Sequence, residues 1–558
     1  MPQQYMERSS NMWNRQGWEM GKTAARGRRW ARGWTRGALL GASVVSAAVV
    51  GAGSAWGAAN AHGGGLAAAP RRGGTLTVLE NSDVAWSGGL SPFTNTSGGV
   101  DYSLNDAIFG ELFELQAGGK VVGDLATGYK VSDRGKTLTI YLRHGVTFSD
   151  GTPFDAAAVA FNFRKDLTTT CSCKPTWTAT SIEAPSRYTV VVHLKVADGA
   201  VINQFQDSIV NWMASPTAVR TMSATAFASA PVGAGPFKVV SDTENSRLVL
   251  RRNPRYWQPG HPYLNGLIFQ TTADDESALE DLRAGDGQAY EAMSTPSLVS
   301  AFRSAGLTVT ADPATATSDV QLNTMQPPFN NLKAREAVYY ATDAAALDKG
   351  INLDTFPVSQ SFTGPTGLFY EPKVPGYRTY DLAKAQALVH QLGGLSFTLM
   401  TNSGPQQPEI ASAVQSMYQA AGMHVTLQLV DLASLVQNYL GHNWNAAVST
   451  AGSFDPAAAT GLAFRYLGGT PFSGVNDPHL NALIEAAASI RNASGRAKIY
   501  ASIAAYLNKM AYSPFLYSVA VWNVAAKGVT GPGLTTQLPE AIRSPTILWE
   551  DVAMAAKP

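Results

Sequence analysis

The residue types that most often carry catalysis are present in this 558-residue chain, but they form no recognisable catalytic motif. The sequence contains no G-x-S-x-G, H-E-x-x-H, G-x-x-x-x-G-K-S/T or G-x-G-x-x-G pattern. Its eight histidines are scattered, and no two stand at the spacing of a shared metal site. A Ser/His/Asp triad assembled only by folding stays open. The motif search otherwise favours a protein that is not an enzyme.

Aromatic side chains are the second group that could do chemistry. The chain has 12 Trp and 20 Tyr. Such side chains suit a cleft in which apolar surfaces and a few fixed polar groups grip a flexible solute. Large aromatic residues are more often part of the core, so we expect only a few of them to line a cleft.

The N-terminal end of the sequence is strongly basic. Residues 1–61 carry eight Lys or Arg and two Glu, a net charge of +6, which leaves −5 for the rest of a chain whose total is +1. An uncharged run rich in Ala, Gly and Val covers residues 37–61 and ends in the small-x-small sequence Ala59-Asn60-Ala61. This order is typical of a cleaved export signal.

Arg28 and Arg29 precede the uncharged run and indicate a signal of the twin-arginine type, although their neighbours differ from the usual consensus. The alternative is an uncleaved anchor, because the run is long enough to span a bilayer; its Gly and Ala content favours the signal. No Cys stands near the expected cleavage region, so we expect no lipoprotein. We expect an exported protein on the periplasmic or extracellular face of the membrane. Its mildly acidic remainder gives no support for nucleic-acid binding.

The chain has two cysteines, Cys171 and Cys173, in the sequence Thr-Cys-Ser-Cys-Lys. In an exported protein this spacing indicates a short local disulfide or two surface thiols. A zinc site would need two further ligands, and no His lies in this stretch. We therefore expect neither a metal site nor a cofactor.

The clearest structural element lies at residues 137–163. Residues 137–142 alternate polar and apolar side chains and are rich in Thr, Ile and Tyr, which predicts a strand. The sequence Asp150-Gly151-Thr152-Pro153 then predicts a tight turn. Asp155 stands where it can cap a helix that begins at Ala156. This is architecture without chemistry of its own.

Elsewhere, predicted strands and helices alternate along the chain. This alternation favours the α/β class, with a parallel or mixed sheet covered by helices. The patterns predict helices at residues 104–115, 381–392 and 408–421, and strands at residues 72–80, 187–196, 247–251, 396–401 and 425–430.

Five separated blocks together resemble the family 5 extracytoplasmic solute-binding proteins of ABC importers, which include dipeptide, oligopeptide and nickel binders. The blocks stand in family order within residues 72–549. They are LRHGVTF with DGTP at 142–153, PVGAGPFKV at 231–239, RNPRYW at 252–257, LNT with PPFNN at 322–331, and YSPFLY at 512–517. The sequence Gly285-Asp286-Gly287-Gln288 departs from the family's usual G-E-x-D.

The resemblance implies a two-lobe fold of the type II periplasmic-binding-protein kind, with mixed sheets, an inserted domain and two hinge crossings. The implied division is a signal and lead-in at 1–69, lobe I at 70–105, the inserted domain at 106–228, lobe I again at 229–320, lobe II at 321–514 and a return to lobe I at 515–558.

The resemblance also assigns candidate ligand-binding residues. In peptide-binding members an aspartate of the second lobe holds the ligand's α-ammonium, and Asp455 is the only acid in the corresponding segment, residues 444–456. A carboxylate suits this task because its hydrogen bonds to an ammonium group are charge-assisted. The alternative is that Asp455 begins an Asp-Pro turn and caps the following helix. Further candidates for the cleft are Trp444, Phe454, Asn323, Trp212 and Phe93.

The function that the resemblance implies is solute capture for an ABC importer. A monomer would close about its hinge on a small peptide or similar solute and deliver it to permease subunits in the membrane. A nickel chelate, an oligosaccharide or an opine would use the same scaffold. Two other classes stay open: a hydrolase that borrowed the fold, and a sensor or chaperone-like protein that presents its ligand to a receptor.

Overall fold

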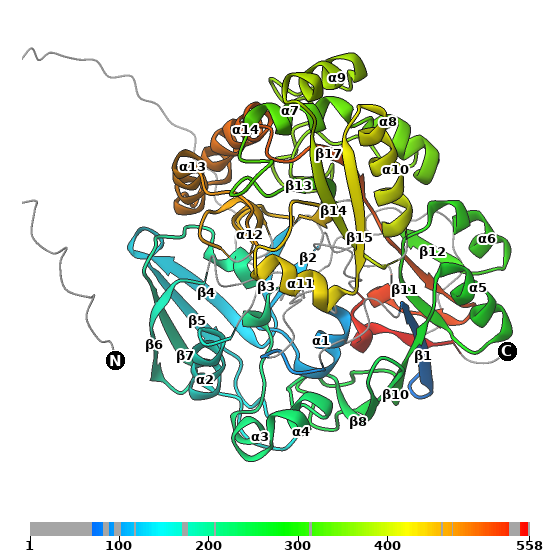
Figure 1. The fold of residues 1–558 in the computed structure, drawn as a ribbon. Coiled ribbons are helices and arrows are strands. Elements are labelled where there is room, and N and C mark those ends of the chain that lie inside the picture. The colour runs from blue at the N-terminus through cyan, green and yellow to red at the C-terminus, as the bar shows by residue number, and fades with distance from the viewer. Residues whose placement is uncertain are drawn as a thin grey trace, which may run out of the picture. The chain divides into compact units, whose positions relative to one another are not determined.

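The structure is a computed structural model, and Figure 1 shows its fold. The chain divides into two units, residues 1–67 and 68–558. The structure describes residues 70–81, 89–93, 102–116, 119–169, 177–205, 208–311, 315–404, 406–452, 454–458, 461–470, 472–534 and 547–555, all in the second unit. The predicted signal at 1–69 and the predicted pair of Cys171 and Cys173 lie outside the described residues.

Lobe I is built on a seven-stranded mixed sheet with the order β12-β18-β11-β1-β10-β9-β8. β1 runs parallel to both of its neighbours, and all the other pairs are antiparallel. The strands are β1 (Thr75–Asn81), β8 (Phe237–Thr243), β9 (Arg247–Arg252), β10 (Gly266–Thr272), β11 (Ala289–Met293), β12 (Thr308–Ala311) and β18 (Trp522–Ala525). The helices are α1 (Tyr102–Phe109), α5 (Asp275–Ala284) and α6 (Val299–Ser304).

The inserted domain carries a separate antiparallel sheet with the order β4-β5-β7-β6, together with the ribbon β2–β3. These strands are β2 (Phe113–Gln116), β3 (Lys120–Gly123), β4 (Ala126–Ser132), β5 (Thr137–Leu142), β6 (Ala179–Ser186) and β7 (Thr189–Leu194). Its helices are α2 (Ala156–Asp166), α3 (Pro216–Thr221) and α4 (Ala224–Ser229).

The strand, turn and helix predicted around residues 137–163 are confirmed. β5 has the predicted bounds, and α2 begins after Asp155, whose side chain accepts a hydrogen bond from the backbone N–H of Ala157 at 3.1 Å. In the turn, Asp150 accepts from the Thr152 backbone N–H at 2.8 Å and from the Ser215 hydroxyl at 2.6 Å. These contacts tie the turn to the start of α3, so the turn serves the architecture of the inserted domain.

The helix predicted at residues 104–115 is wrong in its second half. α1 ends at Phe109, and β2 follows. The carbonyl oxygens of Ile108 and Phe109 accept hydrogen bonds from the backbone N–H groups of Gly235 and Ala234, at 3.1 and 3.0 Å. In a longer helix these two carbonyl oxygens would accept hydrogen bonds from residues of the helix itself, but here another segment bonds to them. The end of α1 therefore depends on a tertiary contact, which the periodicity of its sequence does not predict.

Lobe II contains a five-stranded mixed sheet with the order β15-β14-β16-β13-β17. Its strands are β13 (Ala316–Leu322), β14 (Ser396–Asn402), β15 (His424–Val430), β16 (Ala446–Ala451) and β17 (Phe515–Val519). The helices are α7 (Leu332–Ala341), α8 (Ala344–Leu347), α9 (Leu382–Gln391), α10 (Gln407–Ala420), α11 (Leu432–Leu440), α12 (Leu462–Tyr466), α13 (Pro478–Ser489) and α14 (Ala493–Met510). The alternating helices and strands predicted between 381 and 430 are confirmed, and so is the α/β class with mixed sheets.

The chain passes between the lobes twice. It leaves lobe I after β12 and enters lobe II as β13; it leaves lobe II after β17 and re-enters lobe I as β18. The two crossings are paired at both ends, because Ala311 pairs with Trp522 in the first sheet and Ala316 pairs with Val519 in the second. Such a two-stranded connection has the arrangement of a hinge.

The predicted domain boundaries need correction at four places. The division at 105/106 falls inside α1, the division at 228/229 inside α4, and the division at 320/321 inside β13. The predicted return to lobe I at residue 515 coincides with the start of β17, which pairs with β13 in the sheet of lobe II. The sheets therefore give residues 316–519 to lobe II.

The hydrophobic cores connect the parts of the molecule unequally. One core joins lobe I to the inserted domain and contains no residue between 316 and 519. A second core, here called the hinge core, joins lobe I to lobe II; in it the Phe356 ring of lobe II stacks on Trp522 of β18 with centroids 5.9 Å apart. Within the described residues, no hydrophobic core contains buried residues of both the inserted domain and lobe II.

Candidate functional site

Asp455 lies between β16 and α12, where lobe II meets the inserted domain. It is only 1% exposed. Its Oδ1 accepts from Arg496 Nη1 of α14 at 2.8 Å and from the Ala457 backbone N–H at 3.0 Å. Its Oδ2 accepts from Asn203 Nδ2 at 2.6 Å, and Asn203 belongs to the 3₁₀ turn at Val201–Phe205 of the inserted domain. The carboxylate is therefore already held by a cation, by its own turn and by a side chain from across the boundary.

The alternative interpretation of Asp455 is only half right. The Asp-Pro turn is present, because the Ala458 backbone N–H donates to the Asp455 carbonyl oxygen at 2.9 Å. The helix that follows starts at Leu462 with Gly461 as its N-cap, so Asp455 does not cap it. The ammonium-binding role of Asp455 stays a prediction.

Phe454 lies next to two other parts of the chain. Its carbonyl oxygen accepts from the Leu368 backbone N–H at 2.7 Å. Its ring covers Gly119 of the β2–β3 turn, where an added Cβ would lie 1.7 Å from a ring carbon. Phe454 is therefore a second contact between lobe II and the inserted domain, and Gly119 is the residue that leaves room for it.

Trp444 and Asn323 are brought together, but through the backbone. Asn323 Nδ2 donates to the Trp444 carbonyl oxygen at 3.0 Å, and its Oδ1 accepts from the Met325 backbone N–H at 3.2 Å. The Trp444 ring packs edge-to-face on Tyr439 with centroids 4.9 Å apart. Asn323 thus braces the end of β13 against the segment that leads into β16, and both side chains are buried.

Trp212 and Phe93 lie in a different region. Trp212 is 1% exposed and packs edge-to-face on Tyr102 of α1 at 5.0 Å. Phe93 stacks on Phe227 of α4 at 6.4 Å. Both belong to or pack on the core that joins lobe I to the inserted domain, whereas Asp455 and Trp444 belong to lobe II. The structure does not place these two aromatic residues with the other candidates.

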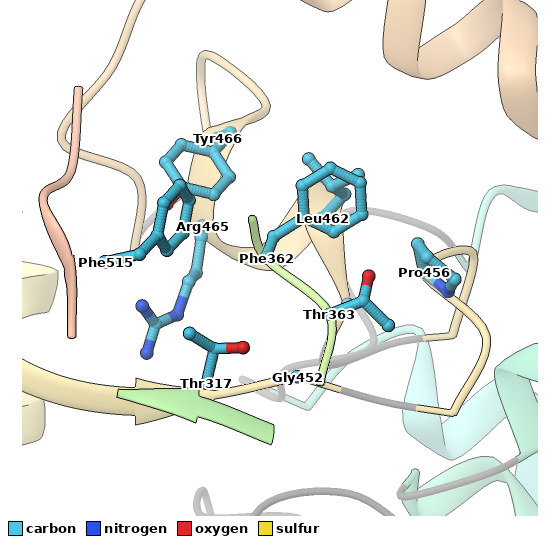
Figure 2. Close-up of a pocket in the computed structure, with 10 residues that line it drawn as sticks. Thr317, Phe362, Thr363, Gly452, Pro456, Leu462, Arg465, Tyr466 and Phe515 are labelled. Carbon is cyan, nitrogen blue, oxygen red and sulfur yellow. The ribbon is translucent and has the colours of Figure 1, made fainter. Parts of the chain in front are cut away.

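A small cavity of about 20 Å³ lies inside lobe II beside this segment (Figure 2). Figure 2 shows Arg465, Tyr466 and Phe515 at one end of it and Pro456 at the other. The Thr363 hydroxyl lines the cavity and is buried without a hydrogen-bond partner. This volume has room for about one water molecule, and most of the side chains around it are apolar.

Arg465 at this cavity forms a buried ion pair with Asp319 of β13. Its Nη1 contacts Asp319 Oδ1, and its Nη2 donates to the Ser449 hydroxyl at 2.8 Å. The Tyr466 hydroxyl donates to Asp319 Oδ2 at 3.3 Å. Burial raises the pKa of Asp319, and the Arg465 guanidinium acts in the opposite direction. All partners of this pair belong to lobe II.

A second cavity, of about 70 Å³, lies between the inserted domain and lobe II. Thr178 and residues 196–198 line it from one side, and Leu462, Ile484 and Tyr500 line it among others from lobe II. Asp198 in its wall accepts from the Ala200 backbone N–H at 2.8 Å and from Gln204 Nε2. Burial raises the pKa of Asp198 to about 7.

Sequence reasoning missed Asn203, Arg496, Asp319 and Arg465. One signal was available, since Asp319 interrupts the strand sequence ATSDVQL, and a charge within a buried strand requires a partner. The identity of that partner, 146 residues later, has no local signal. Nothing near Asn203 indicates that its amide meets a carboxylate 252 residues away.

Two searches of the described residues give negative results. No helix among them is both long enough and apolar enough to cross a bilayer. No group of three or more His, Cys, Asp or Glu side chains in the described ranges is placed to hold a metal ion.

Comparison with known proteins gives one family and one fold. Residues 120–471 match the sequence model of the bacterial extracellular solute-binding proteins, family 5, middle region. The chain is similar to the glutathione-binding protein GsiB of Salmonella paratyphi A, with 30% identity over 297 residues, 52% of this chain and 57% of that protein. The match thus spans little more than half the length of this relative.

Two solved structures share the fold over most of the chain. The periplasmic binding protein DppA of Helicobacter pylori, in complex with the peptide STSA, has a TM-score of 0.76 at 20% identity, over 87% of this chain and 99% of that one. OppA of Haemophilus influenzae, in complex with the peptide RPPGFSPFR, has a TM-score of 0.74 at 18% identity, over 86% and 99%. The predicted two-lobe binding-protein fold is confirmed. Since the family match covers more than half of the sequence, this chain belongs to the bacterial extracellular solute-binding proteins of family 5.

Proposed function

We propose that this protein is the extracytoplasmic substrate-binding component of an ABC importer and that it captures a peptide-like solute. The observation that carries the proposal is the connection between the lobes: in a family of solute-binding proteins, lobe II is joined to lobe I by two paired crossings and by the hinge core. Such a connection permits closure around a solute without unfolding either lobe.

The mechanism that follows has a binding step and a delivery step. The open protein takes the solute between the lobes, and lobe II rotates about the paired crossings until the solute is enclosed. A permease in the membrane then accepts the closed form and receives the solute when the lobes separate. The chain itself acts as a binding protein and not as an enzyme, and the energy for transport comes from ATPase subunits inside the cell.

A peptide is the leading solute, because the similar proteins reported above are named for glutathione or were solved with peptides. The predicted contact between Asp455 and a solute ammonium group is not needed for this proposal, since three donors already occupy that carboxylate. We further propose that the chain is exported through a twin-arginine-type signal that is cleaved, that it is not a lipoprotein, and that it acts as a monomer.

Native mass spectrometry and small-angle X-ray scattering of the purified protein test the proposal together. We expect a co-purifying mass that reduced glutathione or a mixture of tri- and tetrapeptides displaces. Once the co-purifying solute has been removed, we expect the radius of gyration to fall when the same peptides are added. The free amino acid glycine serves as the control and should change neither quantity.

Two outcomes would contradict the proposal. One is an unchanged radius of gyration and no retained mass with every peptide tested. The other is turnover of a chromogenic peptide or ester, which would support the hydrolase alternative. The mass of the mature N-terminus checks the signal: a chain that still begins near Met1 would exclude cleavage.

A further inference from the structure

Lobe II is attached to the rest of the molecule in two different ways. On the hinge side it shares a hydrophobic core with lobe I, in which Phe356 stacks on Trp522 and also on Tyr517 at 5.9 Å. On the side of the inserted domain, the described residues form no shared core, and a cavity of about 70 Å³ separates the two surfaces. A boundary without a continuous apolar core is the one that can separate at low cost, because little apolar surface becomes exposed.

Among the described residues, three hydrogen bonds and one aromatic ring packed on a glycine cross this boundary. Asn203 Nδ2 donates to Asp455 Oδ2 at 2.6 Å. The Gly199 backbone N–H donates to the Ala488 carbonyl oxygen at the end of α13 at 2.8 Å. The approach at Gly199 is tight, since an added Cβ would lie 2.6 Å from the backbone nitrogen of Arg491. The two surfaces are therefore in register through specific hydrogen bonds.

We propose that Asn203, Asp455 and Arg496 form a latch between the inserted domain and lobe II, and that this latch must open before a solute enters or leaves. Asp455 is then a positioning residue for closure. The inference deepens the proposed function and rests on it for its biological purpose, although the latch itself needs no solute.

The arrangement of charges suits a contact that forms and breaks repeatedly. Arg496 and Asp455 both belong to lobe II, and only 6% and 2% of their side chains are exposed, so their ion pair does not depend on closure. The pair holds the carboxylate in place and leaves Oδ2 directed at the boundary. Opening replaces the Asn203 amide at that oxygen by water, so opening costs only the net free energy of one hydrogen bond, which corresponds to about a tenfold change in the opening equilibrium.

Hydrogen–deuterium exchange of the solute-free protein tests the latch at a distance from the mutated side chain. The amide of Gly199 is the reporter, because its hydrogen bond crosses the boundary. We expect Asn203→Ala to speed its exchange about tenfold, and Asn203→Asp to speed it more, because a second carboxylate would face Asp455. The amides of β7, which are bonded within the inserted domain, should exchange at the wild-type rate in both variants.

Asn438→Ala is the matched control. Asn438 is half-buried like Asn203, but its Nδ2 donates to the Ser434 carbonyl oxygen within α11 at 3.0 Å. We expect this variant to leave the Gly199 amide unchanged. Wild-type exchange at Gly199 in both Asn203 variants would overturn the latch, and so would an equal rise at Gly199 and in β7, which would indicate unfolding of the domain. Failure to bind peptides would overturn the proposed function without affecting this measurement.

Discussion

Two buried arginine–aspartate pairs in lobe II look alike and differ in one respect. Arg465 and Asp319 have side-chain exposures of 7% and 1%, and Arg496 and Asp455 have 6% and 2%. The partners of the first pair, Ser449 and Tyr466, all belong to lobe II. The second pair has in addition Asn203, which belongs to the inserted domain.

The comparison teaches that burial alone does not separate a structural charge pair from a moving one. An ion pair with all its partners in one rigid body stabilises that body, and its contacts do not change when the body moves relative to its neighbours. An ion pair with one partner on another body changes its surroundings whenever the bodies move. The location of the third partner is therefore the feature that distinguishes Asp455 from Asp319.

The largest effect should come from breaking the pair that lies wholly inside lobe II. Arg465→Ala leaves Asp319 buried without its cation, and we expect a loss of about 3–5 kcal/mol in the free energy of unfolding. Urea denaturation measures it. The control is Arg283→Ala, which breaks an exposed pair with Glu280 (2.6 Å, with 45% and 70% of the side chains exposed) and should cost less than about 1 kcal/mol. Equal losses in the two variants would show that burial of the first pair is unimportant.

The second effect concerns Asp198, a buried carboxylate that has no arginine in hydrogen-bond contact but lies near the Asp455 pair. Its pKa of about 7 in the folded protein exceeds the unfolded value of about 3.9. At a pH between these two pKa values, Asp198 holds a proton in the folded state that it releases in the unfolded state. The free energy of unfolding therefore falls as the pH rises towards 7, and above pH 7 the loss stays constant.

Asp198→Asn removes this penalty, and we expect it to stabilise the protein by up to about 4 kcal/mol at pH 8 and by much less at pH 5. Gln204 Oε1 is buried without a hydrogen-bond partner. If the Gln204 side-chain amide rotates by half a turn, this oxygen can accept a hydrogen bond from the amide group introduced at position 198. Urea midpoints at the two pH values measure the difference. Asp455→Asn is the contrast and should destabilise at pH 8, because Arg496 loses its carboxylate. A pH-independent effect of Asp198→Asn would contradict the assignment.

A third pair of substitutions sharpens the comparison by keeping the positive charge. Arg465 donates from both Nη atoms to two partners, whereas Arg496 donates from Nη1 to Asp455 and has a buried Nε without a partner. Lysine cannot reproduce the planar fork of arginine. We expect Arg465→Lys to cost about 2 kcal/mol and Arg496→Lys about 1 kcal/mol of unfolding free energy. The reverse order in thermal or urea denaturation would refute this ranking.

The smallest effect should follow from Tyr466→Phe. The hydroxyl lies 3.3 Å from Asp319 Oδ2, which is a long hydrogen bond, so its removal should cost about 0.5–1 kcal/mol. The variant should leave deuterium exchange at Gly199 unchanged, because in the described part of the chain the Tyr466 hydroxyl bonds within lobe II. Faster exchange at Gly199 would show that the two ion pairs communicate.

The sequence was sufficient where local chemistry decides the structure. β5 and the start of α2 were predicted to the residue, because strand alternation, an Asp-Gly turn and an aspartate cap all act within a few positions. The end of α1 was mispredicted because amides from residues 234 and 235 take its last carbonyl groups. The two lobes and the hinge were predicted from the family resemblance, because the periodicity of apolar residues does not show how strands group into lobes.

The site was predicted less completely than the fold. The sequence indicates Asp455 by its place in an aromatic segment. The structure adds two hydrogen-bond partners, Asn203 and Arg496, which the residues next to Asp455 in the sequence do not predict. Trp444 and Asn323 came together, while Trp212 and Phe93 joined another core. Long-range pairs of polar side chains depend on how the domains pack against one another. No local sequence pattern predicts that packing.

The paired crossings have a consequence for engineering. Since Ala316 pairs with Val519, and Ala311 pairs with Trp522, lobe II is one uninterrupted piece of chain whose two ends are neighbours. Residues 316–519 can therefore be exchanged for the same piece of a relative as a single cassette, with only two junctions to join. The transplanted lobe would sit on the lobe I side of the hinge core, so the residue that replaces Phe356 in the graft must pack on Trp522, which stays with lobe I.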